Sequence, residues 1–134
     1  MNSKLIFLLV LLVAPGKGLS QYSLEIEITG LRNDRGCIML QLFNENQAVI
    51  GEEKGAIKDD KSIIVFKDLK PGRYAVRYFH DENLDGKLET NGIGKPLEGY
   101  GFSNNAYGMF GPKPFKEWLF DISDNKKIVL KTKY

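Results

Sequence analysis

Apolar and polar residues alternate along several short segments of this chain, and this pattern restricts the fold more than any other feature. A period of two is typical of a β-strand with one buried face, whereas an amphipathic helix repeats its apolar residues every three or four positions. No long stretch has the helical period. The segments predicted as strands are residues 24–29, 37–43, 62–66, 73–80, 117–122 and 128–132.

Turn-forming residues separate the predicted strands. Residues 33–36 read Asn-Asp-Arg-Gly, and Pro71 and Gly72 occupy the positions that a type II turn favours. Short strands divided by such turns are typical of a β-sandwich. We therefore predict an all-β, two-layer antiparallel β-sandwich of the Ig-like or transthyretin-like kind, with six to seven strands and one long ordered loop.

The first half of the chain carries two more specific expectations. Strands 24–29 and 37–43 are expected to pair as a hairpin. Residues 44–60 are weakly patterned and are expected to be a connection, with one helical turn near Gln47 or a short edge strand at Ala56-Ile57 as alternatives. The residues expected to be mostly buried are Leu24, Ile26, Ile28, Ile38, Leu40, Leu42, Ile64, Phe66, Tyr74, Val76, Trp118, Phe120, Ile128 and Leu130.

Residues 1–20 have the pattern of a secretory signal peptide. Lys4 supplies a positive charge, residues 5–13 are apolar, and Gly18 and Ser20 are small residues where a signal peptidase reads the chain. The apolar run is shorter than the roughly 20 residues that span a bilayer, and no cysteine follows it for a lipid anchor. We expect export to the periplasm or the extracellular space, with residues 21–134 forming a single β-sandwich domain.

The exported protein is expected to begin at Gln21, because cleavage after Ser20 satisfies the small-residue preference of the peptidase. The intact mass of the exported protein measures this directly. A mass that retains residues 4–20 would contradict the assignment.

Charge and cysteine content exclude some partners. The chain has 19 Lys and Arg against 17 Asp and Glu, and two of the basic residues, Lys4 and Lys17, lie in the leader. The mature domain is therefore formally neutral, and its net charge gives no reason to expect nucleic acid or an anionic membrane as a partner. No second apolar segment predicts a membrane span, and we expect a monomer. Cys37 is the only cysteine and is expected to be a small buried hydrophobe.

One strand–turn–strand segment carries a resemblance to known modules. Residues 66–76 read F-K-D-L-K-P-G-R-Y-A-V, which resembles the signature F-x-x-L-x-P-G-x-Y-x-V of transthyretin-like and carboxypeptidase-regulatory-like modules of exported proteins. From about residue 24 onward the chain resembles the bacterial family called domain of unknown function 2141, on residues 71–76, 79–83, 85–88, 94–96 and 98–104. The resemblance implies an exported β-sandwich and no particular activity. Glu89 stands where this family is expected to have Asp, and it keeps the carboxylate.

Oxygen-bearing side chains recur at every second position after the fourth predicted strand. Asp81, Asn83 and Asp85 would give side-chain oxygens to a cation, Lys87 its backbone carbonyl, and Glu89 a carboxylate directly or through water. The sequence therefore predicts a Ca²⁺ site in this loop. A solvated, Asx-rich turn without an ion is the alternative.

The acidic loop differs from an EF-hand. Gly86 permits the sharp turn, but Gly92 stands where an EF-hand has its bidentate Glu, and the flanking segments are not helical. Glu98 is a candidate to fold back and complete the set of ligands.

The loop of residues 92–114 is rich in glycine, aromatic and amide residues, a composition that suits either a ligand site or a cap packed on the sandwich. Its apolar content is too high for a solvated linker, so we expect it to be ordered. The residues proposed as a ligand patch are Tyr100, Phe102, Asn104, Asn105 and Tyr107.

The sequence leaves three functions open. We favour an exported non-enzymatic accessory module that binds a small molecule, a glycan or an envelope protein. One alternative is a hydrolase of envelope carbohydrate or peptide, with His80 and carboxylates of residues 81–98 as acid and base groups. The other is a purely structural module stabilised by calcium. Neither a Ser-His-Asp arrangement nor a zinc-ligand spacing is visible, so no catalytic residue is assigned and Ca²⁺ is the only expected cofactor.

Overall fold

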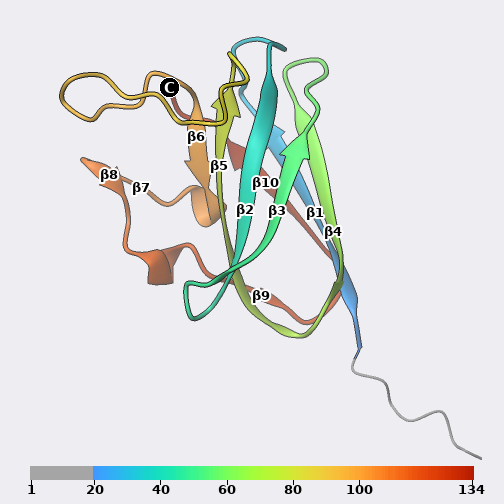
Figure 1. The fold of residues 1–134 in the computed structure, drawn as a ribbon. Helices are drawn as coiled ribbons and strands as arrows, with labels where there is room; N and C mark the ends of the chain where they lie inside the picture. The colour runs from blue at the N-terminus through green and yellow to red at the C-terminus, as the bar shows by residue number, and fades with distance from the viewer. Residues whose placement is uncertain (1–19) are drawn as a thin grey trace, which may run out of the picture.

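The computed structural model describes residues 20–134, so the predicted leader lies outside the described residues except for Ser20. The described chain contains β-strands and two short 3₁₀ turns, and no α-helix (Figure 1). Residues 20–134 contain no helix that is long and apolar enough to cross a membrane. The elements are β1 (Tyr22–Thr29), β2 (Cys37–Asn44), β3 (Val49–Gly55), β4 (Ser62–Leu69), β5 (Gly72–Asp81), β6 (Tyr100–Phe102), η1 (Ser103–Asn105), β7 (Tyr107–Gly108), β8 (Gly111–Pro112), η2 (Phe115–Glu117), β9 (Phe120–Ile122) and β10 (Lys126–Lys131).

Two sheets face each other. One has the strand order β10-β1-β4, and the other has the order β3-β2-β5-β6, with β9 also paired to β5. The pair β7–β8 forms a small separate hairpin. The predicted all-β sandwich is confirmed, although β1 and β10 pair in parallel within an otherwise antiparallel arrangement.

The predicted hairpin between the first two strands is wrong. β1 pairs with β4 and β10, whereas β2 pairs with β3 and β5, so the two strands lie in different sheets. Both strands carry a fully apolar inner face. Such a strand fits either sheet of a sandwich, because the period of two marks a buried face without specifying the neighbouring strand. The structure places the two strands in opposite sheets, where both apolar faces join the core.

The prediction for residues 44–60 also needs correction, because β3 occupies residues 49–55. This strand lies at the edge of its sheet, and most of its side chains are exposed. An edge strand with both faces near solvent needs no apolar alternation, so the periodicity of the sequence could not reveal it. The turn before β5 differs as well: Asp68 has φ 60°, and Gly72 is not among the residues with positive φ that a type II turn would require.

The main core lies between the two sheets. Of the residues predicted to be buried, Phe66 and Ile128 are half-buried and the others are buried. Tyr78 is also buried, at 1% exposure, and its hydroxyl group lies 3.0 Å from Thr132 Oγ1. Cys37, expected to be buried, is half-buried.

A second, smaller cluster packs on the outer face of the five-stranded sheet. It contains Phe43, Ala75, Phe102, Ala106 and Trp118. The strand predicted at residues 117–122 is shorter in the structure, where β9 begins at Phe120. Trp118 follows η2 and packs in this second cluster instead of the main core. This cluster fixes the segment between β6 and β9 against the sheet.

Candidate metal centre

The acidic loop begins where β5 ends. Along β5 the outward-facing positions include Arg77, Phe79 and Asp81, because side chains alternate between the faces of a strand and Tyr78 and Val76 belong to the core. Asp81 is only 2% exposed because the loop folds over it. Its Oδ2 accepts a hydrogen bond from the Gly86 N–H at 2.8 Å, while its Oδ1 is buried without a hydrogen-bond partner.

Three carboxylates converge at this point. Asp81, Asp85 and Glu98 each bring one oxygen to within 4.8 Å of the others. Glu98 is 5% exposed, and its oxygens accept hydrogen bonds from the Glu82 N–H at 2.8 Å and the Glu89 N–H at 3.2 Å. These two bonds tie the far end of the loop to its beginning, so Glu98 folds back onto the first turn.

The other predicted ligands lie around this group. Asn83 Oδ1 accepts from the Asp85 N–H at 3.3 Å, and Asn83 Nδ2 donates to Asp85 Oδ2 and to Glu89 Oε1. Lys87 donates its N–H to Asp85 Oδ1 at 2.9 Å. Glu89 therefore contacts Asn83, while Glu98 takes the place beside Asp81 and Asp85.

The electrostatics of the loop favour a cation. Among residues 20–134, no basic side chain forms an ion pair with Asp81, Asp85 or Glu98. The hydrogen bond from the Lys87 N–H lowers the pKa of Asp85. The amide of Asn83 favours ionised Glu89, but the neighbouring carboxylates of Asp85 and Glu98 outweigh it and raise the pKa of Glu89. A divalent cation would relieve this repulsion between like charges.

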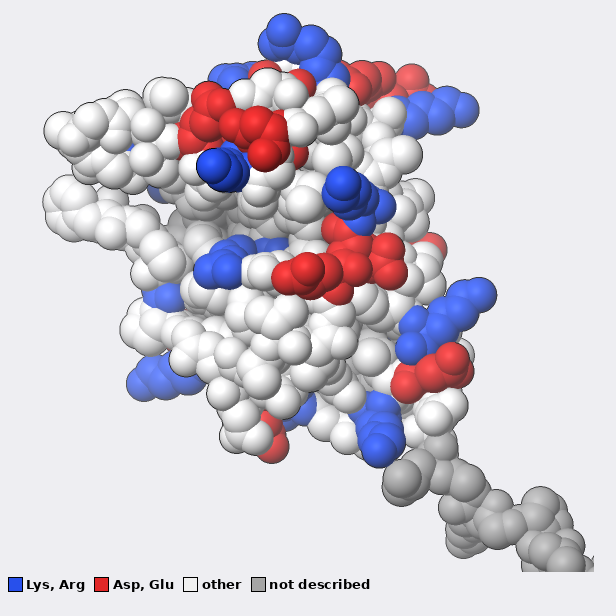
Figure 2. Space-filling view, viewed as in Figure 1, with Lys and Arg blue, Asp and Glu red and all other residues white. Residues whose placement is uncertain are grey.

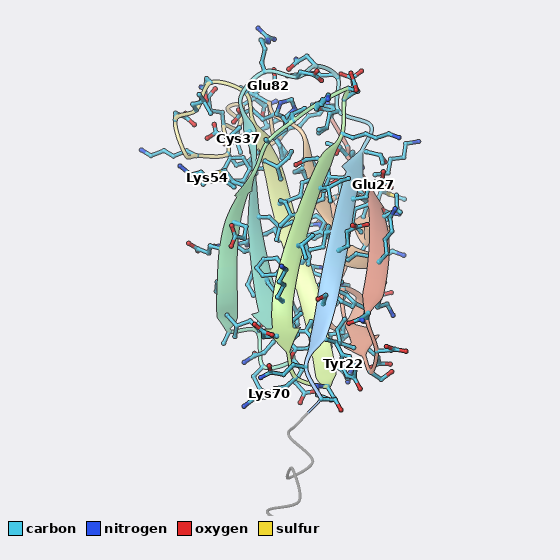
Figure 3. The ribbon with its side chains drawn as sticks, turned by 90° about the vertical axis from the view of Figure 1, so that its right-hand side faces the viewer. Tyr22, Glu27, Cys37, Lys54, Lys70 and Glu82 are labelled. Atoms are coloured by element: carbon cyan, nitrogen blue, oxygen red, sulfur yellow. The ribbon has the colours of Figure 1, made fainter. Side chains whose placement is uncertain are left out.

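Glu82 is next to the three carboxylates, because its N–H donates to Glu98. It lies at the end of the sandwich opposite Tyr22 and Lys70 (Figure 3). Arg32 and Arg35 both pair with its carboxylate, and Asn33 Nδ2 donates to it at 3.3 Å. Burial alone would raise the pKa of Glu82, but the hydrogen bonds from Arg32 and Asn33 outweigh it, and the pKa lies below its usual value. The charge of Glu82 is thus paired with basic side chains, whereas Asp81, Asp85 and Glu98 have no basic partner within residues 20–134. Exposed acidic side chains gather at this end of the molecule in Figure 2.

His80 lies on the core-facing side of β5, and its Nδ1 is 4.0 Å from Oε1 of Glu82 in the acidic loop. It is fully buried, with Nε2 2.6 Å from the Arg35 carbonyl and Nδ1 2.8 Å from the Tyr134 hydroxyl. A carbonyl only accepts hydrogen bonds, so Nε2 carries a proton and donates to Arg35, while Nδ1 is hydrogen-bonded to the Tyr134 hydroxyl. Both ring nitrogens are therefore occupied by the fold.

The proposed ligand patch contains residues with internal partners. Phe102 is 6% exposed and belongs to the second cluster, so it does not present its ring at the surface. Tyr100 and Tyr107 are half-buried, and the single proton of the Tyr107 hydroxyl is shared between the carbonyls of Tyr100 and Lys131, which lie 2.8 and 2.6 Å from the hydroxyl oxygen. These contacts fasten the loop to the sandwich.

The two asparagines of the patch are exposed, but their amides also bond within the protein. Asn104 Nδ2 donates to the carbonyls of Glu117 and Leu119, and Asn105 Oδ1 accepts from the Lys131 N–H at 3.0 Å. Met109 and Phe110, at the tip of the β7–β8 hairpin, are 89% and 97% exposed. This hairpin and the loop between β5 and β6 project from the same side of the sandwich (Figure 1).

The fold and this loop define an all-β sandwich with three converging carboxylates at one end of its five-stranded sheet. The chain matches the bacterial family described as "Uncharacterized protein conserved in bacteria (DUF2141)" over residues 26–129, and it belongs to that family. Comparison with curated proteins and with solved structures finds no match.

Proposed function

We propose that the protein is an exported, non-enzymatic binding module whose loop at residues 81–98 is fixed by Ca²⁺. The observation that carries the calcium site is the buried Oδ1 of Asp81, which has no hydrogen-bond partner and belongs to a side chain that converges with Asp85 and Glu98. A buried carboxylate oxygen without a partner is costly. A bound cation would supply the missing partner.

The ligand chemistry favours calcium over softer metals. Asp81, Asp85 and Glu98 offer only oxygen, and within residues 20–134 no His or Cys joins them in a metal-binding group. Calcium takes 6–8 oxygen ligands in flexible geometry, so water and loop carbonyls complete a set that three side chains begin. Such a partial set corresponds to the weaker extracellular sites, with dissociation constants on the order of 10⁻⁴–10⁻³ M.

The hydrolase alternative has less support. It assigned His80 as an acid or base, but His80 is buried and both of its ring nitrogens have partners. A general base needs a nitrogen within hydrogen-bond reach of the substrate. The side chains of Tyr107, Asn104 and Asn105 form hydrogen bonds within the protein, which favours a structural role for the loop at residues 92–114. The binding surface of the module then lies outside this loop.

Calcium is expected to stabilise the fold. At about 1 mM Ca²⁺ the gain is about 1 kcal/mol, from RT ln(1 + [Ca²⁺]/Kd), which corresponds to a rise in Tm of roughly 3–6 °C for a domain of this size. Thermal melts in calcium and in chelator measure it. Asp81→Asn should abolish the calcium-dependent rise because it removes the charge at nearly constant size.

Asp121→Asn is the matched control. Asp121 is an exposed β9 residue whose side chain lies 4.0 Å from Arg73, and it is not among the converging carboxylates. This variant should keep the full calcium response. Equal Tm values with calcium and chelator in the wild type, or an undiminished rise in Asp81→Asn, would contradict the proposal.

A further inference from the structure

A groove crosses the outer face of the five-stranded sheet, beside the acidic loop. Its volume is about 710 Å³, which lies within the range of small-molecule sites. Two rows of side chains form its floor, because β3, β2 and β5 are in register: Lys54, Met39 and Phe79 lie in one row, and Glu52, Gln41 and Arg77 in the next. The hollow is visible below the acidic group in Figure 2.

The row through Arg77 holds a fixed positive charge. Arg77 Nη2 donates to Gln41 Oε1, and Gln41 Nε2 donates to Glu52 Oε1 at 2.9 Å. The guanidinium also lies 5.3 Å from the centre of the Phe43 ring. Within residues 20–134, no carboxylate pairs with Arg77 at ion-pair distance. Its position is thus set by neutral partners, and its charge remains available to an anion.

The neighbouring row is mostly apolar. Met39 and Phe79 are half-buried in the floor, and Leu88 of the acidic loop lines the same groove at 37% exposure. Lys54 adds a second positive charge at the β3 end of this row, and the carboxylates of Glu52 and Glu53 line the β3 edge of the same groove, so Arg77 is the cation farthest from β3. An apolar strip beside an unpaired guanidinium is complementary to a molecule that has an apolar body and one anionic group.

We propose that this groove binds small amphipathic carboxylates of the fatty-acid type. The carboxylate pairs with Arg77, and the hydrocarbon chain lies over Met39 and Phe79 against Leu88. A charge-assisted, bidentate bond gives the anion its position, and the burial of the chain adds affinity. The carboxylate would be the ligand of the binding module proposed above, and the effect of calcium on its binding rests on that proposed function.

The link to calcium follows from the placement of two elements. Asp81 lies two residues beyond Phe79 on the same face of β5, and both Gly86 and Leu88 of the acidic loop line the groove. A cation held by Asp81, Asp85 and Glu98 would fix the loop and with it the position of Leu88. Calcium should therefore increase the affinity for the carboxylate, and the carboxylate should increase the affinity for calcium.

The test is a titration of the ¹⁵N-labelled protein with octanoate, followed by amide chemical shifts, with octylammonium and acetate as probes that reverse the charge or lack the chain. Octanoate should shift the amides of Met39, Gln41, Arg77 and Phe79, and the two other probes should shift them far less. Arg77→Met should weaken octanoate binding about tenfold, as expected for loss of a charge-assisted bond. Arg73→Met removes an exposed arginine from the same strand outside the groove and should leave binding unchanged.

Separate titrations distinguish the two proposals. Octanoate binding that is the same in calcium and in chelator would overturn the link to calcium and leave the groove assignment in place. Calcium shifts at Asp85 and Glu89 without octanoate shifts in the groove would overturn the ligand class and leave the metal site in place. Equal binding of octanoate and octylammonium, or an unchanged affinity in Arg77→Met, would also overturn the assignment of the groove.

Discussion

Replacing Ser103 with alanine is expected to lower the free energy of unfolding by about 1–3 kcal/mol. β6 pairs with β5 as far as Arg77, and β9 pairs with it as far as Tyr74, so neither strand reaches the stretch between them. Ser103 fills this gap: its Oγ accepts from the Val76 N–H at 2.9 Å and donates to the Trp118 carbonyl at 2.6 Å. Ser103 is fully buried, so alanine would leave both backbone groups without a partner and out of reach of water.

Urea unfolding of Ser103→Ala and Ser123→Ala measures this effect. Ser123 is exposed after β9, and its replacement is expected to change stability by less than about 0.5 kcal/mol. If the Ser103→Ala protein is as stable as the Ser123→Ala protein, the two hydrogen bonds of the Ser103 hydroxyl do not contribute to the stability of the fold.

A second large loss is expected from Gly101→Ala. A Cβ added at Gly101 would lie 2.3 Å from the ring atoms of Tyr78, which is closer than any stable contact. Tyr78 cannot easily move, because it is buried and its hydroxyl group is hydrogen-bonded to Thr132. Overpacking of this kind costs about 1–3 kcal/mol, which urea unfolding would detect as a lower midpoint.

Gly92 provides the matched control, since a Cβ there meets no atom within 4 Å and its φ is not positive. Gly92→Ala is expected to cause no loss. In a Tyr78→Leu background, Gly101→Ala should cost less than in the wild type, because the clashing ring is gone. A cost that is the same in both backgrounds would rule out the Tyr78 contact as its cause.

The sequence pattern predicted the strands that have one buried face. β1, β2, β4, β5 and β10 each carry apolar residues on the face that meets the core, and a period of two reports such burial. β3 was missed because it is an edge strand that joins the sheet through backbone hydrogen bonds to β2, and such bonds leave no apolar period in the sequence. The pairing of β1 with β4 and β10 was missed as well, because periodicity marks a buried face without naming the strand beside it.

In the two proposed sites, too, residues in a local sequence pattern could be predicted, whereas residues brought together by the fold could not. The regular spacing of Asp81 and Asp85 was visible in the sequence, whereas Glu98 was only a candidate because its position depends on how the loop folds back. Arg77 and Phe79 were not predicted as site residues. They gain meaning only when the register places them beside Gln41 and Met39, on a face that the core packing leaves open.

The most direct test of the calcium site is a crystal structure of the protein grown in millimolar calcium, with anomalous diffraction used to locate the ion. We expect an anomalous peak whose distances to oxygens of Asp81, Asp85 and Glu98 are about 2.3–2.6 Å, the range of calcium coordination. The Oδ1 atom of Asp81 should be one of these ligands. A well-ordered loop with no peak among the three carboxylates, or a calcium ion bound only elsewhere, would contradict the account.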